Sequence, residues 1–283
     1  MADTAPPVRL YCFAHAGAGV SAFNGWARSI GPGVETVPLL LPGRERRRRE
    51  PRLTDRPALV ADLLDRVRPE PGRPFILYGH SLGAMVAHTL TQALHEQGRP
   101  LPALLAVGAC PPPDETSELA DSADSADSAD SADSADAWLL DRLSAMGAVP
   151  AGARPDGYWH RAVLPVLRDD LRLAHALRAF ARSAAGSRGH LPVPLLAVAG
   201  DRDPLAPPPL VAGWRRWSAR PVVTRTVTGD HFFVRGEALP RLLGRAARVV
   251  RRLATTPTPP EPCTPAPPHG RPAVTGRQAV PAG

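Results

Sequence analysis

The chain has 283 residues and a formal net charge of +7 at pH 7, a length that suits one large domain with additions better than two separate domains. Its three cysteines are too scattered for a disulfide framework or a metal site. No apolar run approaches the length of a membrane span, and the start lacks the features of a signal peptide. We therefore expect a cytoplasmic protein. The basic balance favours acidic partners, but aromatic residues make up only 5% and no basic stripe is interleaved with them, which argues against nucleic acid.

The first part of the chain predicts buried strands that alternate with helices. Residues 8–13 form an apolar run typical of a central strand, which leads into a loop of small residues at 14–19 and a helix near 23–30. A glycine-rich loop is also typical of phosphate sites, but this one lacks the Lys-Ser/Thr of a P-loop and the spacing of a dinucleotide fingerprint. Next we expect a strand at 34–41 and an amphipathic surface helix at 57–67.

The most informative stretch is Gly-His-Ser-Leu-Gly at 79–83, between a predicted buried strand at 74–77 and a predicted helix at 84–94. This order is the nucleophile elbow of the α/β-hydrolases, in which a sharp turn lifts the hydroxyl of Ser81 clear of the sheet. Both flanking positions must be glycine, because a side chain there would clash with the neighbouring strand or helix. An ordinary strand-to-helix turn has the same local pattern, but the flanking elements favour the elbow.

Two backbone N–H groups are candidates for stabilising an oxyanion beside this serine. Leu82 follows the serine at a helix N-terminus, so its N–H would point at the developing charge. In a hydrolase the loop after an early strand supplies the second N–H, and we assign it to Ala16. A plain tight turn is the alternative for that loop.

After a predicted strand at 104–108, the alternation stops until the next strand at 194–200. In between, residues 120–136 repeat Ala-Asp-Ser, a composition that cannot bury enough apolar surface to offset its ordering entropy, so we expect disorder. Helices are expected at 138–146 and 158–184. A helical insertion between two strands, at the carboxyl edge of a sheet, is where a lid would lie.

The remaining pattern predicts a helix at 210–218, a strand at 222–227 and a closing helix at 238–253. Beyond this helix the chain is rich in proline without periodicity, which predicts a disordered tail. Together the elements predict an α/β fold with a mostly parallel central sheet, helices on both faces and a helical lid insertion. The expected parts are a core of residues 1–113 and 188–254, a lid insertion of 114–187 that contains the disordered repeat, and a tail of 255–283.

A serine, a late aspartate and a still later histidine follow one another in the order typical of α/β-hydrolases. His231 has both a preceding strand and a glycine-bearing loop, so we expect it to take the proton from Ser81 and later activate water. Asp201 and Asp203 both follow the strand that ends at Gly200. We prefer Asp203 as the acid that orients the imidazole, because reaching His231 needs a residue out on the loop, and Asp201 remains the alternative.

Residues 44–49 contain five arginines and one glutamate. One interpretation is a basic surface that attracts an acidic partner by long-range electrostatics. The other is a solvated loop in an arginine-rich protein, with Arg44 alone held structurally by the Pro42-Gly43 turn.

Several segments together resemble the type II thioesterases of polyketide and nonribosomal-peptide assembly lines, within the α/β-hydrolases. The resemblance covers roughly residues 10–253. Its motifs are Cys-Phe-Ala-His-Ala-Gly at 12–17, Leu-Pro-Gly-Arg at 41–44, Gly-His-Ser-Leu-Gly-Ala at 79–84, Leu-Pro-Val-Leu-Arg-Asp-Asp at 164–170 and Gly-Asp-His-Phe-Phe at 229–233. The elbow is generic to the superfamily, whereas the Pro-Gly-Arg, lid and His-Phe-Phe segments are more specific.

The resemblance implies a catalytic triad of Ser81, Asp203 and His231, with oxyanion N–H groups on Ala16 and Leu82. It implies hydrolysis of acyl groups stalled on the phosphopantetheine arm of acyl or peptidyl carrier proteins, without a metal or other cofactor. The alternatives are an esterase or lipase of small free esters, an acyltransferase of the same fold, and a catalytically dead binding module. A complete serine, aspartate and histidine set makes the last of these the weakest.

Overall fold

The computed structural model describes residues 6–117, 129–147, 149, 157, 159–185 and 190–255. In this part of the chain six strands form one parallel sheet in the order β2-β1-β3-β4-β5-β6. The strands are β1 (Val8–Phe13), β2 (Val34–Pro38), β3 (Phe75–His80), β4 (Leu104–Gly108), β5 (Leu195–Gly200) and β6 (Val222–Val227). From β1 the chain continues to β2 on one side of it and then returns to β3 on its other side. The loops that follow β1 and β3 therefore diverge at a topological switch point, which is where open α/β sheets bind their ligands.

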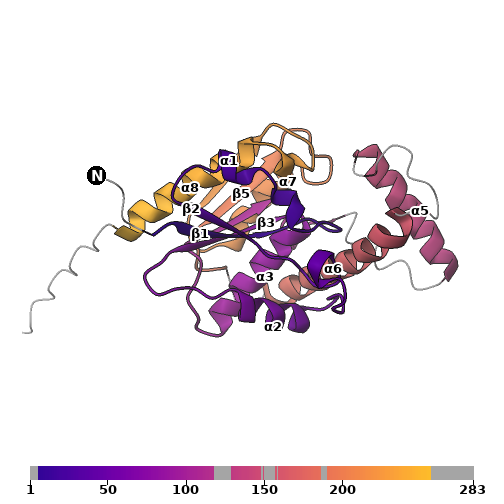
Figure 1. The fold of residues 1–283 in the computed structure, drawn as a ribbon, viewed down its shortest axis with the longest axis horizontal. Coiled ribbons are helices and arrows are strands. Elements are labelled where there is room, and N and C mark those ends of the chain that lie inside the picture. The colour runs from indigo at the N-terminus through magenta and orange to yellow at the C-terminus, as the bar shows by residue number, and fades with distance from the viewer. Residues whose placement is uncertain are drawn as a thin grey trace, which may run out of the picture.

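Helices cover both faces of the sheet (Figure 1). One face carries α1 (Trp26–Ser29) and α8 (Ala238–Thr255), and the other carries α2 (Arg56–Arg66), α3 (Leu82–Glu96) and α6 (Leu164–Ala185). Successive residues of β1 serve the two layers in turn: Leu10 packs in the cluster of Trp26 and Leu243, and Tyr11 packs in the cluster of Leu59. The α/β fold with a parallel sheet and helices on both faces, predicted from the sequence, is therefore confirmed.

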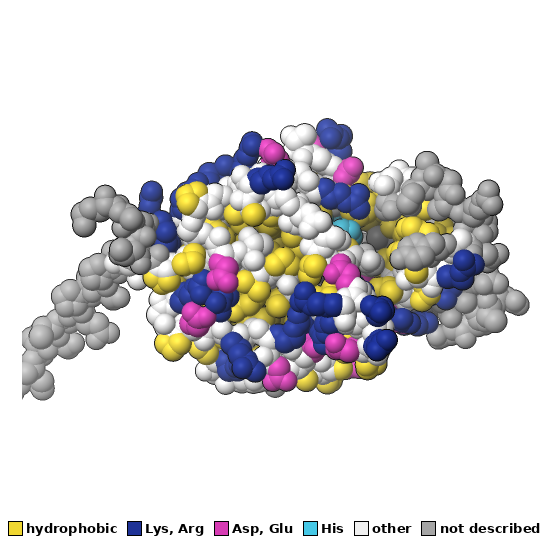
Figure 2. Space-filling view, in the orientation of Figure 1, with side chains coloured by type: hydrophobic (Ala, Val, Ile, Leu, Met, Phe, Trp, Pro, Cys, Tyr) yellow, Lys and Arg dark blue, Asp and Glu magenta, His cyan; other side chains and the backbone are white. Residues whose placement is uncertain are grey.

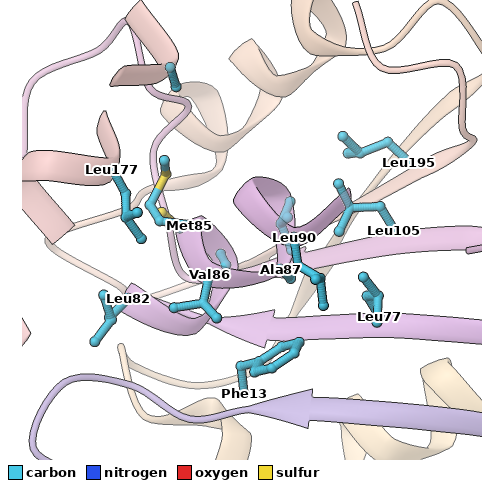
Figure 3. Packing of buried hydrophobic residues seen from close by; sticks show 14 of the residues in the cluster. Phe13, Leu77, Leu82, Met85, Val86, Ala87, Leu90, Leu105, Leu177 and Leu195 are labelled. Atoms are coloured by element: carbon cyan, nitrogen blue, oxygen red, sulfur yellow. The ribbon is translucent and has the colours of Figure 1, made fainter. Parts of the chain in front are cut away.

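The helix that follows the elbow, α3, lies at the centre of the molecule. Figure 3 shows its residues Val86 and Leu90 packed over the sheet side chains Phe13 and Leu77, while Met85 faces Leu177 of α6 on the other side. All of these side chains are buried, and full burial of one such side chain stabilises the fold by about 1.5–3 kcal/mol. Because α3 is packed from both sides, its first turn and the residue before it are held firmly in place.

The insertion between β4 and β5 contains α5 (Ala129–Ala145), the short η4 (Trp159–Val163) and α6. Leu139 and Leu143 of α5 pack against Leu164, Leu167 and Leu171 of α6 in a separate small cluster. Figure 1 shows α5 standing beyond the sheet, beside the first turns of α6, whose later turns run back under α3. The insertion is thus helical, as predicted, and has a small apolar core of its own.

The disorder predicted for residues 120–136 is wrong for its second half. Residues 129–136 form the first half of α5, so this helix starts nine residues before the predicted start at 138. Alanine has the highest helix propensity of all residues, and the segment continues directly into a helix anchored by Leu139 and Leu143. Residues 120–128, and the predicted tail apart from Thr255, lie outside the described residues.

Three other elements differ from their predicted bounds. The helix expected near 23–30 is split into η1 (Val20–Phe23) and α1, because Gly25 between them adopts a left-handed backbone with φ of 84°. The strand expected at 34–41 ends at Pro38, and the buried leucines that follow lead into the turn at Gly43, where φ is 81°. The helix expected at 210–218 is α7 (Pro208–Val211) followed by η5 (Ala212–Trp217).

Within the described ranges, no helix is both long and apolar enough to cross a membrane.

His88 of α3 makes stability depend on pH. It is buried against the rings of Trp214 and Trp217, and its Nδ1 has no hydrogen-bond partner among the described residues. Burial, assisted by the charge of Arg56, lowers its pKa from 6.5 to about 4. Between these two pH values His88 is protonated in the unfolded chain but neutral in the folded protein. The free energy of unfolding therefore decreases as the pH falls from 6.5 toward 4.

We expect His88→Leu to weaken this acid sensitivity, by up to about 1.4 kcal/mol per pH unit in that window. Urea unfolding of the parent and the variant at several pH values measures the difference. His95→Leu, at an exposed position of the same helix, is the matched control and should change little. An equal pH dependence in parent and His88→Leu protein would contradict the prediction.

Candidate functional site

The elbow has the strained geometry that the sequence predicts. Ser81 lies between β3 and α3 with φ of 56° and ψ of −117°, a conformation that a non-glycine residue rarely adopts. A Cβ atom on Gly79 would lie 1.8 Å from the carbonyl oxygen of Gly83, and one on Gly83 would lie 2.1 Å from that of Phe13. The Ser81 N–H donates to the carbonyl of Gly108 at 2.8 Å, which ties the turn to β4. Glycine is therefore required at both positions for the reason predicted.

The structure brings Ser81, His231 and Asp203 together as a hydrogen-bonded chain. His231 Nδ1 lies 3.0 Å from both carboxylate oxygens of Asp203, so this nitrogen carries the proton and donates it. Nε2 is then the acceptor, and the Ser81 hydroxyl donates to it at 3.1 Å. This is the arrangement in which an imidazole can remove a hydroxyl proton while a carboxylate orients the ring.

Asp203, rather than Asp201, contacts His231. Asp203 is 3% exposed, and its Oδ1 also accepts from the N–H groups of Leu205 and Ala206 at 2.9 and 3.1 Å. Asp201 is exposed and accepts from the N–H of Gly229 at 2.8 Å, so it braces the loop that carries the histidine. The choice between the two aspartates follows the sequence-based preference.

His80, next to the serine, points away from it into the core. Its Nε2 donates to the carbonyl of His231 at 2.7 Å, so its Nδ1 accepts from the hydroxyl of Tyr78 at 2.7 Å. Complete burial, with the nearby His231 and His15, lowers the pKa of His80 well below its usual value, so the ring stays neutral. His80 thus supports the backbone of His231.

The two predicted oxyanion donors lie beside the serine. Leu82 is the first residue of α3, so its N–H is at the positive end of the helix dipole. Ala16 lines the same cavities as Ser81 and His231. The loop after β1 and the start of α3 thus converge on the serine, as the topology requires.

Asp170 of α6 holds the loop that contains Ala16. The N–H of Gly17 donates to Asp170 Oδ2 at 2.7 Å. Arg44 donates to both oxygens of the same carboxylate, at 2.7 and 2.6 Å, and to the carbonyl of Ala18 at 3.1 Å. Both charged side chains are buried, so loss of either would leave the other uncompensated. The insertion is therefore fastened to the loop beside the serine.

Two cavities meet at Ser81 and His231. The first, which we call the Met85 cavity, measures about 220 Å³ and extends between α3, α6 and the segment after β5, with Met85, Leu171, Ala174, Arg178, Leu205 and Leu210 in its wall. The second, the Trp159 cavity, measures about 270 Å³ and extends under the insertion, with His15, Leu143, Trp159, Leu167, Phe232 and Arg235 in its wall. A substrate that spans both cavities would place a central bond at the serine.

Some of these groups escape sequence-based reasoning. The motifs at 41–44 and 164–170 mark Arg44 and Asp170, but nothing in the sequence shows that the two side chains pair across 126 residues. Arg178 was not predicted at all; the signal for it is a charge at helical spacing from Leu171 and Ala174 on an otherwise apolar helix face. Among the described residues, no group of three or more His, Cys, Asp or Glu side chains is placed to hold a metal ion.

The family model described as a thioesterase domain matches residues 8–248. Thioesterase PikA5 of Streptomyces venezuelae is 32% identical over 229 residues, which cover 80% of this chain and 75% of the relative. A probable cadicidin biosynthesis thioesterase of Streptomyces griseus is 29% identical, and the match covers 81% of this chain but 59% of that protein, so the chain spans less than two thirds of its length.

Among solved structures, the RedJ thioesterase from the prodiginine biosynthetic pathway in Streptomyces coelicolor superposes with a TM-score of 0.68 at 31% identity. The superposition covers 89% of this chain and 91% of RedJ. The similarity therefore extends over most of both chains.

Proposed function

The chain belongs to the thioesterase family, and from this we propose that it is a serine hydrolase that removes acyl groups from the phosphopantetheine thiol of carrier proteins in polyketide or nonribosomal-peptide biosynthesis. The observation that carries the proposal is the chain of hydrogen bonds from Ser81 through His231 to Asp203, placed where two cavities meet. The relative named as a probable cadicidin biosynthesis thioesterase and the RedJ thioesterase of the prodiginine biosynthetic pathway support the choice of substrate class.

The proposed reaction begins when Ser81 attacks the thioester carbonyl. His231 Nε2 accepts the hydroxyl proton, and Asp203 stabilises the imidazolium that results. The N–H groups of Leu82 and Ala16 stabilise the tetrahedral oxyanion. The C–S bond then breaks, the thiol leaves with the proton from His231, and the acyl group remains on the serine oxygen.

Water completes the cycle by the same route. His231 removes a proton from a water molecule, whose oxygen attacks the acyl-enzyme carbonyl; the free acid leaves and Ser81 recovers its proton. A thiolate is a better leaving group than an amine, so the first step needs little help from a general acid. The chain's own residues are sufficient for every proton transfer in this scheme.

The decisive test compares matched substrates with one acyl group. The proposal predicts that kcat/KM for the acyl group on a carrier protein exceeds kcat/KM for its simple ester, with the free acid as the product. A higher value for the simple ester would favour an esterase. Transfer of the acyl group to an added alcohol or amine, in preference to water, would favour an acyltransferase.

The structure divides the arginine run at 44–49 into two kinds of residue. Arg44 is buried with Asp170, and Arg47 is mostly buried in contact with Glu50 and Asp62. The other three, Arg46, Arg48 and Arg49, are exposed and make no ion pair with any described residue. Figure 2 shows that basic side chains are numerous on the face viewed, with acidic side chains interspersed among them. We propose that these three exposed arginines attract the acidic surface of a carrier protein.

We expect the triple variant Arg46→Gln, Arg48→Gln, Arg49→Gln to lose up to about tenfold in kcat/KM on a carrier-bound substrate at low salt. Its dependence on ionic strength should also be flatter, because screening acts on the charges that were removed. A small neutral thioester should be hydrolysed at the parent rate. Stopped-flow or steady-state assays at several salt concentrations measure these differences.

The matched control carries the same charge change elsewhere: Arg28→Gln, Arg225→Gln and Arg245→Gln, at exposed positions of α1, β6 and α8. If this control loses as much as the first variant, net charge rather than the position of the run is responsible. Equal losses on carrier-bound and small substrates would indicate structural damage.

A further inference from the structure

The Met85 cavity has a polar group in an otherwise apolar wall. Met85, Leu171, Ala174 and Leu210 contribute apolar surface close to the serine. Arg178 also lines the cavity, although it is only 2% exposed and lies deep in the fold. A purely hydrocarbon substrate would not require a guanidinium in this wall, because burying a charge carries a large desolvation penalty.

The guanidinium of Arg178 is only partly satisfied by the protein. Nη1 donates to the carbonyl of Pro111 at 3.2 Å, and Nη2 donates to the carbonyls of Pro112, at 3.0 Å, and Glu115. These bonds use three of the five N–H groups that a guanidinium carries. Nε has no hydrogen-bond partner, and no carboxylate forms an ion pair with Arg178, among the described residues.

Along α6, Arg178 lies beyond the residues that are fastened to the loop at the serine. The start of α6 is fastened to the loop at the serine, where Asp170 accepts from Gly17. Leu171 and Arg178 are seven residues apart and both line the cavity, so they are separated by two helical turns, or about 10 Å along the axis. An acyl chain of medium length that is attached to Ser81 would end near Arg178.

We propose that the Met85 cavity selects acyl groups of medium length that carry an oxygen acceptor at the end remote from the thioester, a carboxylate binding best, and that Arg178 is the residue that recognises it. This specificity rests on the proposed function, since it concerns the acyl group that the same serine receives. A carboxylate matches the guanidinium in charge and in geometry, so the hydrogen bonds between them offset the water that both groups lose. Neutral acceptors such as a ketone gain a hydrogen bond without the charge.

The experiment uses three pantetheine thioesters of equal chain length on the full protein. One is octanoyl, the second is suberyl, which ends in a carboxylate, and the third carries a ketone on its penultimate carbon. The parent protein should hydrolyse the suberyl substrate with a kcat/KM at least about tenfold above that of the octanoyl substrate, with the ketone between them. The difference should appear mainly in KM, because the contact is made equally in the ground state and the transition state.

Arg178→Met should abolish this preference, because kcat/KM on the suberyl substrate should fall by at least about tenfold more than kcat/KM on the octanoyl substrate. Arg182→Met is the matched control, because Arg182 lies one turn later on α6 near the carbonyl of Pro113 and does not line the cavity. That variant should keep the parent order.

Equal or faster hydrolysis of octanoyl by the parent protein would overturn the inference, whether or not Arg178→Met folds. Equal losses on all three substrates in Arg178→Met would also overturn it, since Arg178 would then act only as a clamp on the segment after β4. If the parent hydrolyses the octanoyl thioester alone, the proposed function stands and the inference fails. If it hydrolyses none of the three, nor any carrier-bound acyl group, the proposed function fails as well.

Discussion

Ser81→Ala is expected to reduce turnover by about 10⁶-fold and to leave the fold unchanged, because the loss of a triad nucleophile has that order of effect. The elbow constrains the backbone of residue 81 through Gly79, Gly83 and the hydrogen bond to Gly108, none of which involves the hydroxyl. Single-turnover assays on a carrier-bound acyl thioester measure the loss, and thermal unfolding checks the fold.

His231→Ala provides the companion measurement. Serine and histidine act as one unit through the 3.1 Å hydrogen bond, so the double variant should be little worse than either single one. Activity of Ser81→Ala within tenfold of the parent would remove this serine from the mechanism. Additive losses would show that the two side chains act in separate steps.

Asp203→Asn should lower kcat by about 10⁴-fold, because an amide in place of the carboxylate favours the wrong tautomer of the imidazole. In the parent both carboxylate oxygens lie 3.0 Å from His231 Nδ1, which fixes the proton on that nitrogen. The amide keeps an oxygen to accept from Leu205 and Ala206, so the local fold should survive. Steady-state kinetics and near-UV circular dichroism separate the two effects.

Asp201→Asn is the matched control for this change. It lies two residues away on the same loop and contacts the backbone of Gly229 rather than the imidazole. A modest loss is expected, from a looser histidine loop. If Asp201→Asn proved the more damaging of the two variants, the acid in the mechanism would be Asp201.

The sequence was sufficient for the features that depend on local patterns. The strand, Gly-x-Ser-x-Gly and helix are contiguous, so the elbow at Ser81 could be predicted together with the need for Gly79 and Gly83. The chain order serine, aspartate, histidine is typical of α/β-hydrolases, and it predicted that His231 lies beside Ser81. Local composition misled in the Ala-Asp-Ser repeat, where helix propensity and an anchored continuation outweigh low hydrophobicity.

The sequence by itself determined the fold class, and it predicted Ser81 and His231 as the nucleophile and the base, because each is encoded in a short stretch whose chemistry has few other uses. Only the tertiary structure decided between Asp203 and Asp201, since both lie on one loop and differ only in which way their side chains point. It alone paired Arg44 with Asp170, and it alone placed Arg178 in the wall of a cavity. Such contacts join residues far apart in the chain, and they depend on packing in three dimensions that no local periodicity encodes.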